Sequence, residues 1–229
     1  MKAQACLVVE RDSAGRSVVR TLRSAAPLTL IPVRGEPVVH LVNSAASPLG
    51  GDDLELTVRL GPGASLRLTG IAATVALPGP GERSRSTVRV TLEAGATLTY
   101  LPEPTVITAR ANHEAILHAT LGAGAVLHYR EILVLGRAGE QPGQLTTTLH
   151  ATRSGRPLLR QQLTIGDQSI ATLAGHRVLA TELHLDDGAP APASGEWWSR
   201  TPLAAGGTLT TALANDAVTA QRLLAHAIQ

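Results

Sequence analysis

The chain repeats one short pattern three times, and this repeat constrains the fold more than any other feature. The three copies are Leu56–Gly70 (LTVRLGPGASLRLTG), Val88–Pro102 (VRVTLEAGATLTYLP) and Leu117–Glu131 (LHATLGAGAVLHYRE). Each copy is predicted to form a strand, a short turn that ends in Gly-Ala, and a second strand. The turn glycines, Gly63, Gly95 and Gly124, lie 32 and 29 residues apart, a spacing typical of repeated supersecondary units.

The sequence around each turn alternates between apolar and polar residues. In the second copy the apolar set is Leu92, Ala94, Ala96 and Leu98, and the polar set is Thr91, Glu93, Thr97 and Thr99. Alternation with a period of two predicts strands that bury one face, and glycine supplies the backbone freedom that a tight reversal needs. The repeats therefore predict an all-β (mainly β) scaffold with internal hairpin repeats. They favour a scaffold role over a catalytic one.

Composition limits the classes of function. The chain has 229 residues, of which 44% are hydrophobic, so it can bury a sizeable core, and we expect one domain spanning residues 1–229. Phe is absent and aromatic residues make up 2%, which predicts an aliphatic core and argues against aromatic platforms for bases or sugars. The 20 basic residues are scattered among 18 acidic ones without a basic run, which argues against nucleic-acid binding.

The single cysteine, Cys6, excludes an internal disulfide framework and any multi-cysteine zinc or iron–sulfur site within one chain. The apolar stretch Ala3–Val9 is followed at once by Glu10, so it is too short for the apolar region of a signal peptide. No stretch approaches the length that spans a bilayer. These features predict a cytoplasmic protein.

Two C-terminal segments differ from the strand pattern. Asp187–Glu196 is the most linker-like stretch, and Leu213–Ile228 is the clearest helix candidate because its apolar residues recur at helical spacing. The apolar face of this helix has two interpretations: it docks a partner, or it packs against the β core.

The eight histidines form no recognisable ligand motif, and phosphate-binding, nucleophile-elbow and zinc-protease motifs are missing. His113 and His118 are five residues apart, so they point to opposite faces of a strand. His118 and His128 flank the third turn, which leaves cross-strand pairing open. Solvated or hydrogen-bonded strand histidines are the commoner alternative.

Carboxylates offer the clearest candidate metal ligands. Asp52, Asp53 and Glu55 begin a strand just after two glycines, and three such groups repel one another unless they are solvated or share a cation. The alternative is a turn that starts the strand, with Glu55 facing solvent. Glu103 and Glu131 each adjoin an apolar strand next to a repeat, either as ordinary surface carboxylates or as the lining of a polar passage.

Four segments together resemble the urease accessory protein family UreD, also called UreH. They are LGGDDLELTVRLGPGASLRLTGIAAT (Leu49–Thr74), LEAGATLTYLPEPTVI (Leu92–Ile107), LGAGAVLHYREILVLGRAGEQPGQL (Leu121–Leu145) and RSGRPLLRQQL (Arg153–Leu163). The matches keep the family's order over roughly half the chain, and it is this order that makes the resemblance specific.

The resemblance implies a β-helix-like, stacked-sheet scaffold with one or two helices near the C-terminus and no catalysis of its own. It implies a nickel-insertion chaperone that binds apo-urease subunits and a UreF-like accessory protein, which recruits a UreG-like GTPase. The resemblance also implies a passage through the protein for Ni²⁺, with no intrinsic cofactor and at most transient nickel binding. Oxygen or imidazole ligands suit such a passage because a closed thiolate cage would release the metal too slowly.

Some positions match the family pattern and others depart from it. Gly50, Gly51 and Asp52 match its Gly-Gly-Asp, and Glu131 and Arg137 match its Glu and Leu-Gly-Arg. The departures are Ser44–Leu49 in place of a His-Pro-Pro-Gly-like stretch, Val75–Leu77 in place of basic and aromatic residues, and Glu103-Pro104 in place of Gln-Glu. The chain also lacks the family's aromatic-rich tail, so it resembles a short, divergent member.

The resulting hypothesis is a urease maturation factor whose transient nickel ligands are Asp52, Asp53, Glu55, Glu103 and Glu131. One alternative is a β-solenoid carbohydrate-active or carbohydrate-binding protein, although the four aromatic residues disfavour a sugar site. Another is a purely structural oligomer subunit, which would be soluble and well folded without either partner.

Overall fold

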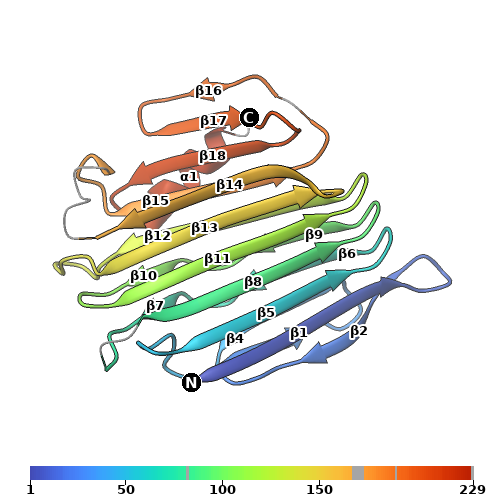
Figure 1. Cartoon of the computed structure of the whole chain (residues 1–229), viewed down its shortest axis with the longest axis horizontal. Coiled ribbons are helices and arrows are strands. Elements are labelled where there is room, and N and C mark those ends of the chain that lie inside the picture. The colour runs from blue at the N-terminus through green and yellow to red at the C-terminus, as the bar shows by residue number, and fades with distance from the viewer. Residues whose placement is uncertain (81–82, 167–172, 189, 228–229) are drawn as a thin grey trace.

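The repeated segments form successive coils of a β-solenoid of about 4 turns. In the computed structural model, which describes residues 1–80, 83–166, 173–188 and 190–227, the chain passes back and forth between two facing sheets. The coils stack in sequence order, from the blue N-terminal strands to the red C-terminal ones (Figure 1). The predicted mainly β, β-helix-like scaffold is confirmed.

Sheet A contains the first strand of each repeat, in the order β14-β13-β11-β8-β5-β1-β2. Its strands are β1 (Lys2–Arg11), β2 (Ser17–Arg23), β5 (Asp53–Leu60), β8 (Ser84–Leu92), β11 (Asn112–Leu121), β13 (Gln144–Arg153) and β14 (Arg156–Ile165). The central strands β1, β5, β8, β11 and β13 run parallel, whereas β2 and β14 pair antiparallel at the two ends.

Sheet B contains the second strand of each repeat, in the order β16-β17-β18-β15-β12-β9-β6-β4-β3. Its strands are β3 (Leu28–Pro32), β4 (Val38–Asn43), β6 (Ser65–Gly70), β9 (Thr97–Leu101), β12 (Val126–Leu135), β15 (Val178–Leu185), β16 (Ala193–Ser194), β17 (Trp198–Pro202) and β18 (Thr208–Ala214). Two short strands, β7 (Thr74–Ala76) and β10 (Thr105–Ile107), pair with each other, and β10 also pairs with the end of β12.

The parallel register places equivalent residues of successive coils side by side. One inward row joins Ala5, Leu56, Val88, Leu117 and Leu149 across five strands of sheet A. Stacking of this kind turns the alternation of each repeat into one continuous core. Among the described residues, the largest fully buried side chains are all Leu or Ile, as the absence of Phe predicts.

The Gly-Ala turns carry the chain from sheet A to sheet B. Gly63, Gly95 and Gly124 have φ values of 62°, 67° and 63°, the left-handed region that glycine enters without steric cost. The alanine that follows each of them is completely buried. Neighbouring turns are also hydrogen-bonded, because the amide of Gly63 donates to the carbonyl of Ala94 at 2.9 Å.

The predicted hairpin pairing within each repeat is wrong. β5 pairs with β1 and β8 in sheet A, whereas β6 pairs with β4 and β9 in sheet B. The two arms of a repeat therefore face each other through their side chains instead of sharing hydrogen bonds. Period-two alternation reports which face of a strand is buried, and it does not identify the neighbouring strand.

The described residues contain one helix, α1 (Ala217–Ala227). The sequence placed its start at Leu213, but that residue lies within β18, where it pairs with Leu179 of β15. Asp216 caps the helix, since its carboxylate accepts the backbone N–H of Thr219 at 2.8 Å. Ala220 and Leu224 pack onto the outer face of sheet B, which confirms the interpretation that the helix covers the β core.

Within the described parts of the chain, α1 falls short of the length and hydropathy of a membrane-crossing helix. The structure describes the predicted linker Asp187–Glu196 except for residue 189. This segment contains the two-residue strand β16.

Candidate functional site

A cavity of about 130 Å³ lies between the two sheets. Inward residues of β5, β8 and β11 form one wall, and residues of β9 and β12 form the other. Its polar lining includes Asn43, Thr74, Glu103, His113 and Glu131, beside the two tyrosines Tyr100 and Tyr129. A space of this size has room for several water molecules, and it offers them the polar partners that buried water needs.

Glu131 is the most unusual group of this cavity. It lies on β12 with its side chain directed between the sheets, and the residue is only 8% exposed. Thr147 of β13 donates its hydroxyl to one carboxyl oxygen at 2.8 Å, and the Tyr129 hydroxyl donates to the other at 3.3 Å. No basic side chain forms an ion pair with Glu131 in the described part of the chain. Its charge is therefore stabilised by hydroxyl groups alone.

Burial raises the pKa of Glu131 to about 7, although the hydrogen bonds from Thr147 and Tyr129 favour the ionised form. The same burial raises the pKa of Tyr129 well above its usual value, with the nearby Glu131 charge adding to the effect. A carboxyl group with a pKa near neutrality exchanges its proton readily at physiological pH, and buried groups with strongly shifted pKa values are candidates for a functional role.

A second, smaller cavity of about 60 Å³ also has Glu131 in its lining. It lies between β13, β14, β15 and β18, and its other polar residues include Thr147, Gln161, Thr181 and Thr211. Glu131 thus stands between two hollows, one lined by earlier strands of the solenoid and the other by later strands. The surface that lines both hollows is mainly apolar, and Glu131 is the lining residue that they share.

The buried His113 adds a neutral nitrogen ligand to the larger cavity. Burial lowers its pKa to about 4, so the imidazole is uncharged at neutral pH. Its Nδ1 lies 2.9 Å from the hydroxyl of Ser84. The rings of Tyr100 and Tyr129 lie in tilted contact, with centroids 5.6 Å apart. Together these groups provide oxygen and imidazole donors that suit a borderline divalent cation.

The structure separates the five predicted nickel-route carboxylates. Glu103 and Glu131 both line the larger cavity. Asp52 is buried elsewhere, where its carboxylate accepts hydrogen bonds from the Ser47 hydroxyl and the Leu49 amide, both at 2.8 Å, and pairs with the amino group of Met1.

The other two carboxylates of the Asp52–Glu55 group face outward. Asp53 is exposed at the start of β5. Glu55 lies on the outer face of sheet A, where it accepts a hydrogen bond from Arg89 at 3.0 Å. Asp52, Asp53 and Glu55 therefore have the local geometry of the alternative from the sequence, a turn that starts the strand with Glu55 facing solvent. The nickel role of all five residues stays a prediction.

His113 and His118 follow the predicted strand geometry, whereas the pairing left open for His118 and His128 does not occur. His113 points inward and His118 outward, as their spacing predicts. The open pairing of His118 with His128 does not form, because these residues belong to different sheets. His118 instead neighbours His150 in sheet A, with ring centroids 5.7 Å apart.

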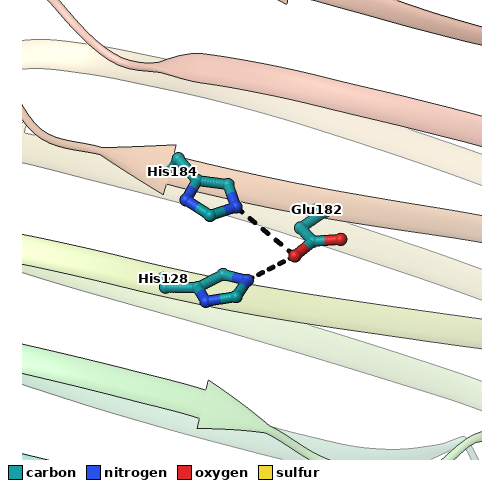
Figure 2. A group of neighbouring side chains, drawn as sticks. All are labelled: His128, Glu182 and His184. Carbon is teal, nitrogen blue, oxygen red and sulfur yellow. Dashed lines mark hydrogen bonds and ion pairs between the residues drawn. The ribbon is translucent and has the colours of Figure 1, made fainter. Parts of the chain in front are cut away.

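His128 meets Glu182 and His184 on the outer face of sheet B. His128 and His184 are directly paired between β12 and β15, and their rings stack with centroids 4.0 Å apart. Both Nε2 atoms point at the same carboxylate oxygen, Oε1 of Glu182, with His184 at 3.3 Å and His128 in closer contact (Figure 2). We refer to these three residues as the outer cluster.

Glu182 lies under the two imidazoles of the outer cluster, and its side chain is 5% exposed. Burial opposes its ionisation, but hydrogen bonds and charge interactions with His128 and His184 lower its pKa to about 2. Sequence reasoning missed this cluster. Glu182 and His184 are two residues apart and share a strand face, but their meeting with His128 depends on the register of β12 and β15.

Comparisons with known proteins agree on one family. A family model described as UreD urease accessory protein matches residues 1–229. The chain is 55% identical over 241 residues to urease accessory protein UreD 1 of Saccharopolyspora erythraea, an alignment that covers 100% of this chain and 94% of that protein. It is 36% identical over 243 residues to urease accessory protein UreD of Streptomyces coelicolor, covering 100% and 96%. It is also 37% identical over 257 residues to urease accessory protein UreD of Parafrankia sp., covering 98% and 86%.

Proposed function

Because the chain belongs to the UreD urease accessory protein family, we propose that it is a platform that joins apo-urease to a nickel-loading complex and carries Ni²⁺ through its interior. Accessory proteins of this family are non-catalytic. GTP hydrolysis then belongs to a UreG-like partner, reached through a UreF-like protein. The predicted cytoplasmic location and single domain fit this role and stay predictions.

The observation that carries the interior route is the position of Glu131 at the junction of the two cavities. A cation that reaches this point compensates the negative charge that burial penalises. When the cation leaves, a proton takes its place, because the pKa of Glu131 is about 7. Exchange between a cation and a proton keeps the metal mobile, since metal affinity competes with protonation of the ligand.

The remaining lining supports passage instead of storage. Glu103 and His113 offer one oxygen and one imidazole donor in the same cavity as Glu131. Cys6, the single thiol of the chain, lies on β1 and is not part of the lining. Hard and borderline ligands with water between them release a divalent ion faster than a set of thiolates does.

A carbohydrate-active or carbohydrate-binding solenoid, the alternative from the sequence, gains no support from membership in a non-catalytic accessory family. The cavity also lacks the exposed aromatic surface that a sugar ring stacks on, because its aromatic residues Tyr100 and Tyr129 are buried.

The platform is tested by co-expressing the chain with apo-urease subunits and a UreF-like partner, followed by a pull-down and a nickel-dependent urease assay. We expect co-purification and an activation that requires the chain. Absence of both binding and activation would refute the platform.

The route is tested in the same system with Glu131→Gln, which keeps the shape and removes the charge. We expect a several-fold loss of urease activation while the complex still co-purifies. Glu93→Gln is the matched control, because Glu93 is an exposed carboxylate beside the second Gly-Ala turn. Full activation with Glu131→Gln would rule out the route through Glu131 and leave the platform standing.

A further inference from the structure

We propose that the outer cluster of His128, Glu182 and His184 is a binding site for a late first-row divalent metal ion. The site lies on the solvent side of sheet B and is separate from the interior cavity. His128 and Tyr129 are neighbours on β12, but alternation places His128 outside and Tyr129 in the cavity lining.

The three donor atoms lie close enough together to share one ion. The ligand atoms of His128, Glu182 and His184 all lie within 4.8 Å of one another. Metal–nitrogen and metal–oxygen bonds of about 2.0–2.2 Å place the ligands of one tetrahedral ion about 3.3–3.5 Å apart. The 3.3 Å between Nε2 of His184 and Oε1 of Glu182 already matches this separation.

The backbone holds this geometry firmly. His128 and His184 are direct cross-strand partners, and Glu182 lies two residues before His184 on the same face of β15. Ligands on paired strands keep their positions better than ligands on loops. β15 is also flanked on its other side by β18, so the cluster lies within the sheet and not at its edge.

The Glu182 carboxylate is directed at the two imidazoles and not at the neighbouring guanidinium. Arg130 is its direct partner on β12 and lies on the same face. Within the described residues, Glu182 forms no ion pair with Arg130 and uses Oε1 for both imidazoles. The carboxylate is therefore placed beside the two groups that would share an ion with it.

Exposure leaves room for further ligands. The side chains of His128 and His184 are 25% and 30% exposed, above the nearly buried Glu182. Three protein ligands leave open coordination positions for water or for a donor from another protein, as in zinc sites that are not purely structural. Two imidazoles and a carboxylate suit Ni²⁺, Zn²⁺, Co²⁺ or Cu²⁺ and not Ca²⁺ or Mg²⁺. The choice of Ni²⁺ as the first probe rests on the proposed function, whereas the site itself does not.

The test is titration calorimetry of the full chain, purified without a polyhistidine tag, with Ni²⁺ and with Zn²⁺. We expect a binding event that His128→Ala/His184→Ala weakens at least tenfold. Glu182→Gln keeps a hydrogen-bond acceptor under the imidazoles but removes the anionic ligand, and we expect at least a tenfold loss there too. Co²⁺ provides a second readout, because its visible absorption reports imidazole and carboxylate coordination and should vanish in both variants.

His118→Ala/His150→Ala is the matched control, because it removes a neighbouring pair of histidines from the outer face of sheet A. We expect unchanged metal binding in this control. Equal affinity in the wild type, the outer-cluster variants and the control would overturn the proposal. Circular dichroism confirms that each variant is folded, and Glu182→Gln decides the question if the double variant is not. Failure of the urease assay leaves this measurement unaffected.

Discussion

Asp52 and Glu131 are both buried carboxylates, yet their surroundings give them opposite properties. At Asp52, burial opposes ionisation, but the Leu49 amide, the Met1 amino group and the Ser47 hydroxyl together hold its pKa below the usual value. At Glu131, burial dominates and raises the pKa to about 7. Sequence alone could not separate these cases, because the depth of burial and the approach of Met1 to Asp52 and of Thr147 to Glu131 depend on the fold.

Replacing Asp52 tests its structural role. Asp52→Ala leaves the Ser47 hydroxyl and the Leu49 amide without their acceptor, so we expect a loss of about 2–3 kcal/mol in the free energy of unfolding. Denaturant titration measures it. Asp53→Ala removes the exposed neighbour and should change stability by less than about 0.5 kcal/mol. Equal effects of the two variants would contradict the structural role.

Glu131→Gln should change how stability depends on pH. The unfolded carboxyl titrates near 4.5 and the folded one near 7, so the folded state binds more protons between these values. The free energy of unfolding of the wild type therefore falls as the pH rises from about 4.5 to about 7. The glutamine variant lacks this loss. Above pH 7 its free energy of unfolding therefore exceeds that of the wild type by at most on the order of 3 kcal/mol.

Thermal unfolding of the wild type and Glu131→Gln at pH 5 and pH 8 checks this prediction. The melting temperature of the variant should exceed that of the wild type at pH 8, and the difference should be much smaller at pH 5. A difference that is the same at both pH values would show that Glu131 ionises like an exposed carboxyl.

At the scale of elements, the Gly-Ala turns decide how the strands are arranged. Each turn places its alanine between the sheets and its glycine in a left-handed conformation. The sequence identified these turns and most of the strands, because glycine and alternation are local signals. It misplaced the start of the helix, since Leu213 fits helical spacing as well as a strand, and pairing with β15 decides between them.

Gly124→Ala tests the backbone requirement alone, because an added Cβ meets nothing within 4 Å. Its φ of 63° is costly for any residue with a Cβ, so we expect a loss of about 1 kcal/mol. This corresponds to a fall of about 2–4 °C in melting temperature for a chain of this size. Ala123→Ser, at the exposed position beside it, should be nearly neutral. A stabilised Gly124→Ala would contradict the left-handed turn.

At the scale of the whole molecule, β12 separates two environments. Its inward residues Tyr129 and Glu131 line the larger cavity, and its outward residue His128 belongs to the outer cluster. The interior route and the outer metal site therefore make independent predictions. Each can be removed by substitutions on one side of a single sheet.

Filling the interior should block the route without disturbing the outer face. Ala115 lines the larger cavity, and Ala115→Leu adds three carbon atoms to a space of about 130 Å³. We expect reduced urease activation with an intact complex and unchanged metal binding by the outer cluster. Thr120→Leu is the control, because Thr120 lies exposed on the opposite face of the same strand. Normal activation by a folded Ala115→Leu protein would argue against passage through this cavity.

The sequence by itself determined the β class, the three repeats, their glycine turns and the aliphatic core, because these depend on neighbours within a few residues. It also carried the motifs that resemble the UreD family. The tertiary structure alone decided that the arms of each repeat belong to opposite sheets. It also decided that Glu131 stands between two cavities, and that His128 meets Glu182 and His184. These features arise from register and stacking between strands far apart in the chain, and the alternation of a single strand carries no information about its partner.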